Sequence, residues 1–314
     1  MDNNEKQKLI VIAGPTAVGK TRYSVELAKR IGAEIVSADS MQVYKYMDIG
    51  SAKVTKDEMQ GIKHYLIDEV EPHEDYNVVR FQEMAKRSLD EIYSKGKIPI
   101  LCGGTGFYIQ ALLYDIDFTA EDDKSQSDEI RAELEKTALE KGNAYVHSML
   151  SEIDPESARL IPENNLKRVI RAIEFYRLHD EKISEHNMRE AEKRSESKYD
   201  LRFFVLTDER EKLYKRIDQR VDKMLEAGLL EEVTKLKNMG ILKSSTAMQG
   251  IGYRELYSYL DGEISLDEAI ELIKRNSRHY AKRQLTWFKR EQKVNWINIS
   301  EIKEVTDEFE KYLW

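Results

Sequence analysis

The chain has 314 residues, of which 41% are hydrophobic and 34% are charged, and its formal net charge is −8. We expect a soluble, globular protein without a membrane partner, because no apolar run approaches the roughly 20 residues needed to span a bilayer. The single cysteine, Cys102, excludes an intrachain disulfide and a metal site built from cysteines. The polar start MDNNEKQK contains no apolar signal core, so the cytoplasm is the expected location.

Apolar runs in the chain predict the strands of a sheet. The first, Leu9–Ala13 (LIVIA), is continuous, as in parallel strands that are buried on both faces. A glycine-bounded loop follows it, and Arg22–Ile31 then shows helical spacing of apolar residues. Further runs at Glu34–Ala38, Ile98–Cys102 and Leu201–Leu206 predict more strands. This order indicates an α/β fold, with a P-loop NTPase-like parallel sheet flanked by helices.

The middle of the chain has a different character. Charged residues dominate positions 121–129, helical spacing runs over 130–179, and a second polar stretch covers 181–200. We therefore predict an all-helical domain at residues 119–199, inserted in the α/β domain and tied in by two polar connections. The predicted core domain comprises residues 1–118 and 200–314.

The C-terminal third is predicted to be mostly helical. Apolar residues recur at helical spacing over Leu213–Leu225. Leu266–Lys289 is expected to form one long helix or two, and Asn295 begins a short tail.

The loop after the first strand carries the most specific chemical pattern, GxxxxGK[ST], which is typical of a phosphate-binding P-loop. Its glycines let backbone N–H groups turn toward a ligand, and the N-terminus of the next helix adds its dipole. Lys20 supplies a cation for phosphate oxygens, and Thr21 offers a hydroxyl to Mg²⁺. The pattern predicts binding of two or more linked phosphates, as in ATP, but not whether phosphate is transferred or leaves. The loop consists of Gly14, Pro15, Thr16, Ala17, Val18, Gly19, Lys20 and Thr21.

Two more features follow predicted strands, at the sheet edge where α/β proteins bind ligands. Asp39 ends the second strand, so it could hold Mg²⁺ through water, act as a general base, or serve only as a turn or capping residue. Gly103–Gly106 (GGTG) follows the strand at Ile98–Cys102. Its glycines fit either a close approach of the backbone to a ligand or an ordinary strand-to-helix turn.

Positive charge gathers in three places although the chain is acidic overall. Arg216 and Arg220 share one helix face, for which the spacing alone favours a solvated surface over a phosphate contact. Residues 274–293 interleave eight basic residues with aromatic ones, as suits a nucleic-acid backbone or a solvated helix with its aromatics turned inward. A smaller basic group lies at 167–177. No HExxH or GxSxG pattern occurs, which excludes metallohydrolase and serine-triad chemistry.

Together these blocks resemble the bacterial tRNA dimethylallyltransferases. The resemblance runs from about Leu9 to about Trp296, through GPTAVGKT, SADSMQVY, GGTGFY, LKRVIRAIE, AMQGIGYRE and RHYAKRQLTWFKR. It implies a P-loop core with an inserted helical domain, Mg²⁺ as cofactor, and a monomer. It also implies transfer of a dimethylallyl group from dimethylallyl diphosphate to the exocyclic N6 amine of the adenosine that follows the anticodon in tRNA.

The resemblance implies roles for individual residues. The P-loop would hold the diphosphate, with Lys20 and Thr21 in the catalytic group and Thr21 as the metal ligand. Asp39 would be the general base, and Arg220 would assist the diphosphate, although the nearby Arg216 leaves that alignment open. The contacts expected with the anticodon stem-loop fall on Asp39, Ser40, Met41, Gln42, Thr105, Lys167, Arg168, Arg171, Gln249, Gly250, Gly252, Tyr253, Arg254, Arg278, Lys282 and Arg283.

Three other functions remain open from the residues alone. A P-loop kinase of a small metabolite would share Gly14–Thr21 and Asp39, but it would not explain the later blocks. A prenyltransferase of free adenine nucleotides would share the catalytic residues, whereas the helical insertion and the basic helix favour a large RNA. A non-enzymatic NTP sensor that binds RNA would form no product.

Overall fold

The computed structural model describes residues 6–116, 124–193, 197–291 and 293–314. The chain divides into two compact units, one of residues 1–113 and 198–314 and the other of residues 114–197. The boundary expected after residue 118 falls in 117–123, outside the described residues. The second boundary was expected between residues 199 and 200, and in the structure it lies two residues earlier, between 197 and 198.

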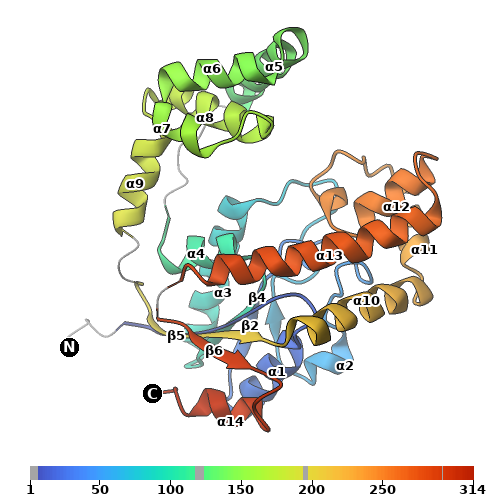
Figure 1. Ribbon diagram of the computed structural model, residues 1–314. Coiled ribbons are helices and arrows are strands. Elements are labelled where there is room, and N and C mark those ends of the chain that lie inside the picture. The colour runs from blue at the N-terminus through green and yellow to red at the C-terminus, as the bar shows by residue number, and fades with distance from the viewer. Residues whose placement is uncertain (1–5, 117–123, 194–196, 292) are drawn as a thin grey trace. The chain divides into compact units, whose positions relative to one another are not determined.

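A six-stranded, fully parallel sheet forms the centre of the first unit (Figure 1). The order across the sheet is β3-β2-β4-β1-β5-β6. The four strands expected from the apolar runs are confirmed to within one residue at each end. The strands are β1 (Lys8–Ala13), β2 (Glu34–Ala38), β3 (His64–Tyr65), β4 (Pro99–Gly103), β5 (Asp200–Thr207) and β6 (Asn295–Asn298).

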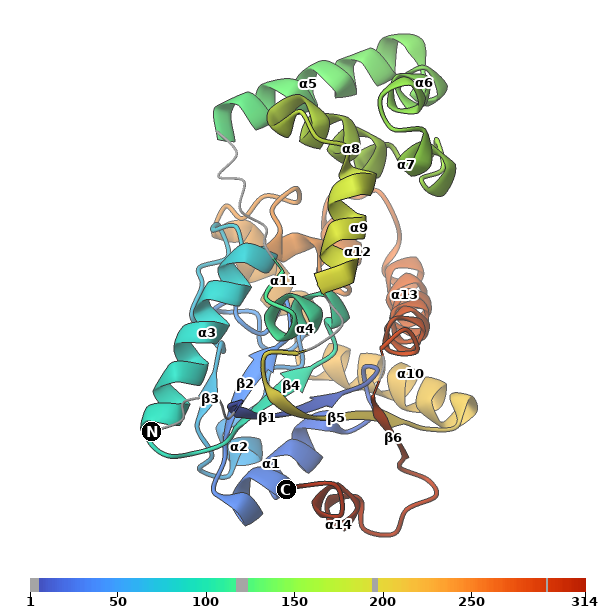
Figure 2. The same ribbon diagram turned by 90° about the vertical axis from the view of Figure 1, so that its left-hand side faces the viewer.

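Strand β1 is a continuous apolar run because both of its faces are buried. Ile10 and Ile12 are fully buried in one cluster with α1 (Lys20–Ile31) and with Phe309 of α14 (Val305–Glu310). Leu9 and Val11 alternate with them, point to the other face, and are also fully buried. In Figure 2, α1 and α14 lie on one side of the sheet, and α3 (Val78–Ser94) and α4 (Gly106–Leu113) lie on the other.

The C-terminal part of this unit contains more secondary structure than the expected helices and tail. The expectation of a short tail from Asn295 is wrong, because β6 pairs with β5 and α14 buries Phe309 completely. Leu266–Phe288 forms one continuous helix, α13, which begins at the capping residue Ser265. The remaining helices are α2 (Lys56–Met59), α10 (Arg210–Glu226), α11 (Leu229–Asn238), the 3-10 helix η1 (Ala247–Gln249) and α12 (Tyr253–Leu260).

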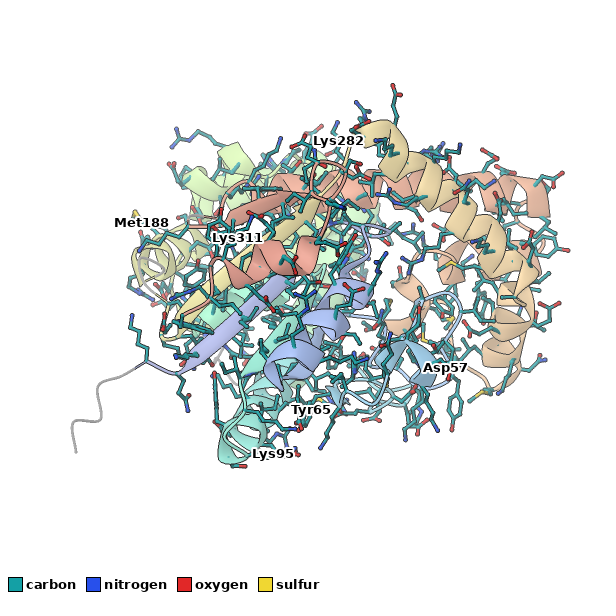
Figure 3. The ribbon with its side chains drawn as sticks, turned by 90° about the horizontal axis from the view of Figure 1, so that it is seen from below. Asp57, Tyr65, Lys95, Met188, Lys282 and Lys311 are labelled. Atoms are coloured by element: carbon teal, nitrogen blue, oxygen red, sulfur yellow. The ribbon has the colours of Figure 1, made fainter. Side chains whose placement is uncertain are left out.

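The amino end of the sheet is held by buried charge. Burial opposes ionisation of Glu34, yet hydrogen bonds from Lys97, Tyr65 and Lys95 lower the pKa of its carboxyl to about 2. The Lys95 ammonium lies 2.7 Å from the Tyr65 hydroxyl and 3.0 Å from Glu34 Oε2. Figure 3 shows Tyr65 and Lys95 close together at this edge. This network ties the end of α3 to β2 and β3, away from the carboxyl edge of the sheet.

Helices are the only regular secondary structure among the described residues of the second unit. Its core includes Leu134, Leu150 and Ile173, all fully buried. Residues 181–200 are not the plain connection that was expected, because most of them form α9. That helix is too polar to be recognised from apolar spacing, and it is held instead by Asp154, which accepts the Ser184 N–H at 3.0 Å. The helices are α5 (Lys124–Lys141), α6 (Asn143–Ile153), α7 (Pro155–Leu160), α8 (Leu166–His179) and α9 (Ile183–Lys193). None of the helices described in either unit has the length and apolar character to cross a membrane.

Candidate active site at the carboxyl edge of the sheet

Four loops meet at the carboxyl edge of the sheet. The residues that begin them are Gly14, Asp39, Gly104 and Asp208. Because β4 lies between β1 and β2, the loop of Gly103–Gly106 lies between the P-loop and Asp39. The Thr105 N–H donates to the Ala38 carbonyl at 3.3 Å, which fixes this loop to the end of β2. The strand order therefore brings the three sequence patterns into one place.

The P-loop has the geometry of an anion cradle. Gly14 and Gly19 have φ angles of 149° and 94°, which favour glycine, and Gly19 precedes α1 without a side-chain cap. The first N–H groups of α1 are therefore left for a ligand. The Lys20 ammonium crosses the loop and donates to the carbonyls of Gly14 at 3.1 Å and Pro15 at 2.9 Å.

Two desolvated cations face this cradle. Burial lowers the pKa of Lys20 to about 8, and the nearby Asp39 carboxylate opposes the shift. Burial likewise lowers the pKa of Arg220, again against the effect of Asp39. Within the described part of the chain, neither Lys20 nor Arg220 forms an ion pair with a carboxylate. Half-buried cations that lack a paired carboxylate indicate a site for an anion.

Helix α10 presents both of its candidate arginines to the P-loop. Arg216 donates from Nε to the Ala17 carbonyl at 3.0 Å, and its Nη2 lies 2.5 Å from Oδ2 of Asp208, whose side chain is fully buried. Arg220 reaches the Thr16 hydroxyl from Nη1 at 3.3 Å. The solvated face favoured by spacing alone is therefore wrong. Asp208 neutralises Arg216, whereas the charge of Arg220 is left for a ligand.

Asp39 makes the turn that was considered for it and keeps its second carboxylate oxygen available. Its Oδ1 accepts the N–H groups of Met41 at 2.8 Å and Gln42 at 3.3 Å, as in an Asx turn. Its Oδ2 has no hydrogen-bond partner among the residues that the structure describes. The turn fixes the carboxylate, and the second oxygen is left for a ligand.

Buried hydroxyls that sequence reasoning mostly missed lie near Asp39. Tyr76 is 2% exposed, and its hydroxyl has no hydrogen-bond partner in the described structure. The buried Thr105 hydroxyl also lacks a partner in good geometry within the described ranges, and Tyr280 of α13 is its polar neighbour. Burial raises the pKa of Tyr280 to about 12, and Asp39 adds to the shift. Buried hydroxyls normally have partners, so this region suits a polar ligand.

The glycines of Gly103–Gly106 leave room for side chains of α13. A Cβ on Gly104 would lie 2.1 Å from Nε2 of Gln284, and one on Gly106 would lie 2.2 Å from Cδ1 of Trp287. Of the two explanations offered by the sequence, close packing at a strand-to-helix turn accounts for these glycines. Gln284 was not a candidate, since nothing in its local sequence marks it.

The segment after Asp39 packs against another expected tRNA-contact stretch. Ser40 is half-buried, and a Cβ on Gly250 would lie 2.7 Å from Sδ of Met41. Gln42 donates to the carbonyls of Ser51 at 3.4 Å and Ala52 at 3.2 Å. Residues 40–42 are therefore fixed to the loop that follows them.

That loop is held by Glu232 of α11, which the sequence did not single out. The Glu232 carboxylate accepts the N–H groups of Asp48, Ile49 and Gly50 at 2.8–3.0 Å. It also accepts the Tyr253 hydroxyl at 2.7 Å. Tyr253 is fully buried, so its side chain makes this structural contact in place of the one expected with tRNA.

The neighbours of Tyr253 are also engaged locally. Gln249 donates to the Lys243 carbonyl at 2.8 Å. Gly252 N–H donates to Glu255 at 2.8 Å, and Arg254 pairs with the same carboxylate at 2.7 Å. Arg254 keeps an exposed side chain, so it remains accessible at the surface.

The basic groups differ in how much of their charge is neutralised. Arg278 of α13 pairs with Asp218 of α10 at 2.5 Å, whereas Lys282 and Arg283 are exposed. Phe288 is 1% exposed and faces the core, as expected for a solvated helix whose aromatic residues turn inward. In the second unit, Lys167 and Arg168 are exposed at the start of α8. There Arg171 lies 3.3 Å from the buried carboxylate of Glu174.

Comparison with known proteins gives concordant matches. The family described as IPP transferase matches residues 42–291. The tRNA dimethylallyltransferase of Lachnoclostridium phytofermentans is 56% identical over 93% of this chain and 92% of its own. That of Acetivibrio thermocellus is 54% identical over 96% and 93%.

Solved structures agree with the sequence relatives. The tRNA isopentenylpyrophosphate transferase of Bacillus halodurans is 44% identical, with a TM-score of 0.71 over 98% of this chain and 94% of that one. A eukaryotic dimethylallyltransferase acting on tRNA is 29% identical, with a TM-score of 0.78 over 97% and 77%. The chain therefore belongs to the IPP transferase family, together with the bacterial tRNA dimethylallyltransferases.

Proposed function

We propose that this protein transfers a dimethylallyl group from dimethylallyl diphosphate to the exocyclic N6 amine of the adenosine adjacent to the anticodon in tRNA. One observation carries the proposal. Lys20 and Arg220, two cations without a paired carboxylate among the described residues, flank the P-loop while the Asp39 carboxylate lies close enough to shift the pKa of both. An anion site beside a general base suits a reaction in which diphosphate leaves and an amine attacks. The relatives that are named for this activity support it.

The chemistry follows from these positions. The amine is a weak nucleophile because its lone pair is delocalised into the adenine ring. As the new N–C bond forms, the allylic C–O bond breaks, and the Asp39 Oδ2 atom accepts a proton from the amine. Lys20, Arg220 and the loop N–H groups would stabilise the charge that grows on the diphosphate. Asp39 is held for this task by the Met41 and Gln42 amides, which bind its other oxygen.

The donors at the P-loop fit Mg²⁺, which we propose as the cofactor. Mg²⁺ usually binds through one or two protein oxygens together with substrate phosphates. The half-buried Thr21 supplies a hard oxygen at the start of α1, and no cluster of three or more His, Cys, Asp or Glu occurs among the described residues. Thr21 would hold the ion, which would neutralise charge on the diphosphate.

A large RNA substrate explains the charge distribution. The protein is acidic overall, yet Lys167, Arg168, Lys282 and Arg283 expose their charges. The target base would be flipped out of the anticodon loop, at a cost of a few kcal/mol, to reach Asp39. We propose that the protein acts as a monomer on cytoplasmic tRNA.

The test is incubation with radiolabelled dimethylallyl diphosphate and Mg²⁺ in the presence of undermodified tRNA or of AMP. Label in the tRNA supports the proposal, whereas label in AMP alone would favour a prenyltransferase of free nucleotides. Transfer of phosphate from ATP without RNA would favour a kinase. Tight RNA binding without product would favour a sensor. We expect Asp39→Asn to bind tRNA normally and to form no product.

A further inference from the structure

Helix α13 lies against both substrate loops through one face. Tyr280, Gln284 and Trp287 follow one another at intervals of four and three residues, which places them on the same side of the helix. Tyr280 neighbours Thr105, and Trp287 lies against Gly106. Gln284, between them, is the residue that also reaches the P-loop.

The Gln284 carboxamide connects the two loops directly. Its Oε1 accepts the Thr16 N–H at 2.9 Å, and its Nε2 donates to the Gly104 carbonyl at 3.0 Å. The side chain is 5% exposed, so water does not readily replace either bond. The arrangement needs one acceptor and one donor on the same short group, which glutamate, methionine and leucine do not provide.

Both ends of this link lie beside groups that would touch substrate. Thr16 receives Arg220 on its hydroxyl at 3.3 Å, within the loop that would hold the diphosphate. Gly104 directly precedes Thr105, which would contact the target nucleotide and whose N–H donates at 3.3 Å to the Ala38 carbonyl beside Asp39. A Cβ on Gly104 would lie 2.1 Å from Gln284 Nε2, so a side chain there would displace the carboxamide. The Gln284 carboxamide therefore gives the two loops a direct link beyond the β1–β4 pairing of the strands that precede them.

We propose that Gln284 is a positioning residue that couples the diphosphate site to the nucleotide site. Diphosphate fixes the P-loop, the carboxamide then fixes the Gly104–Thr105 segment, and tRNA binds a site that is already ordered. The coupling is reciprocal, so tRNA strengthens diphosphate binding by the same factor. This inference rests on the proposed function, since it assigns the two ligands to the two loops.

Loss of this link should not unfold the helix, because α13 has other anchors. Ala281 and Phe288 are 0% and 1% exposed in the core. Arg278 pairs with Asp218 at 2.5 Å, and Lys274 pairs with Asp222 at 2.6 Å, which joins α13 to α10. Figure 1 shows the two helices side by side. A substitution at Gln284 can therefore be read as a change in coupling.

The experiment measures the affinity of the full-length protein for undermodified tRNA, with and without saturating inorganic diphosphate and Mg²⁺. We expect diphosphate to tighten tRNA binding by about fivefold or more in the unaltered protein. In Gln284→Met, which has a similar shape but makes neither hydrogen bond, the ratio should fall to about one while each separate affinity changes less than about threefold. Gln284→Glu keeps the acceptor for Thr16 but loses the donor, so its ratio should fall as well.

A matched control is Gln82→Met on α3. Gln82 is 8% exposed and donates to the Ala111 carbonyl at 2.7 Å, so it is a buried glutamine whose described hydrogen bond joins α3 to α4. This variant should keep the full coupling ratio. Coupling that survives in Gln284→Met, or that is lost equally in Gln82→Met, would overturn the inference.

The product assay separates this inference from the proposed function. If the unaltered protein prenylates tRNA but shows no diphosphate-dependent change in tRNA affinity, the coupling is refuted and the function stands. If it forms no prenylated tRNA, the function fails, and the assignment of ligands to the loops fails with it.

Discussion

Affinity for dimethylallyl diphosphate should fall as the pH rises from 7 to 9, because Lys20 must be charged to bind it. Burial lowers the pKa of this ammonium to about 8, although the Gly14 and Pro15 carbonyls accept its hydrogen bonds. With that pKa, the charged fraction in the free protein falls from about 90% at pH 7 to about 10% at pH 9. Affinity should therefore fall about tenfold if only the charged form binds.

Calorimetric titration with dimethylallyl diphosphate at pH 7, 8 and 9 measures this effect. The control is Lys20→Arg, whose guanidinium stays charged throughout this range, so ionisation of the ligand cancels in the ratio of the two affinities. That ratio should change about tenfold between pH 7 and 9. A constant ratio would refute the assignment of a lowered pKa to Lys20.

The same shift has a consequence for stability. The folded pKa of Lys20, about 8, lies below its ordinary value of 10.5, so between these values the unfolded chain binds more protons than the folded one. The contribution of Lys20 should therefore make the folded state more stable as the pH rises through this window. Denaturation by urea between pH 8 and 10, with Lys20→Met as the control, checks the sign.

Four other substitutions test the surrounding structure. Arg220→Ala should slow transfer about 10²–10³-fold without loss of stability, as measured by single-turnover rates and urea midpoints. Arg216→Ala should instead lower the free energy of unfolding by about 3 kcal/mol, because it leaves the buried carboxylate of Asp208 unpaired. Glu232→Ala should lower it by about 2 kcal/mol in the same urea assay and raise the KM for tRNA, because three N–H groups of the loop after residue 47 lose their acceptor. Glu34→Gln should reduce, by the share that Glu34 contributes, the loss of stability that the unaltered protein shows as the pH falls from 4.5 toward 2, because the folded carboxyl of Glu34 has a pKa of about 2. Equal stability profiles of the two proteins in acid would contradict that account.

Elements with strong local signals could be predicted well. The strands were found because each is an unbroken apolar run, and the P-loop because its glycines, lysine and threonine are all local requirements of phosphate binding. Helix α9 was missed because it is held by polar contacts, such as that of Ser184 with Asp154, that leave no apolar spacing. Strand β6 was missed because a four-residue edge strand has little pattern of its own.

The sequence by itself determined the fold class, the P-loop and the candidate residues Asp39, Thr105 and Arg220. Only the tertiary structure decided how they meet, because strand order and side-chain approach depend on residues far apart in the chain. Spacing placed Arg216 and Arg220 on one helix face, but the buried carboxylate of Asp208 decides which charge is left for a ligand. Gln284 lies 268 positions from Thr16, so no local pattern could reveal that its carboxamide joins the two loops.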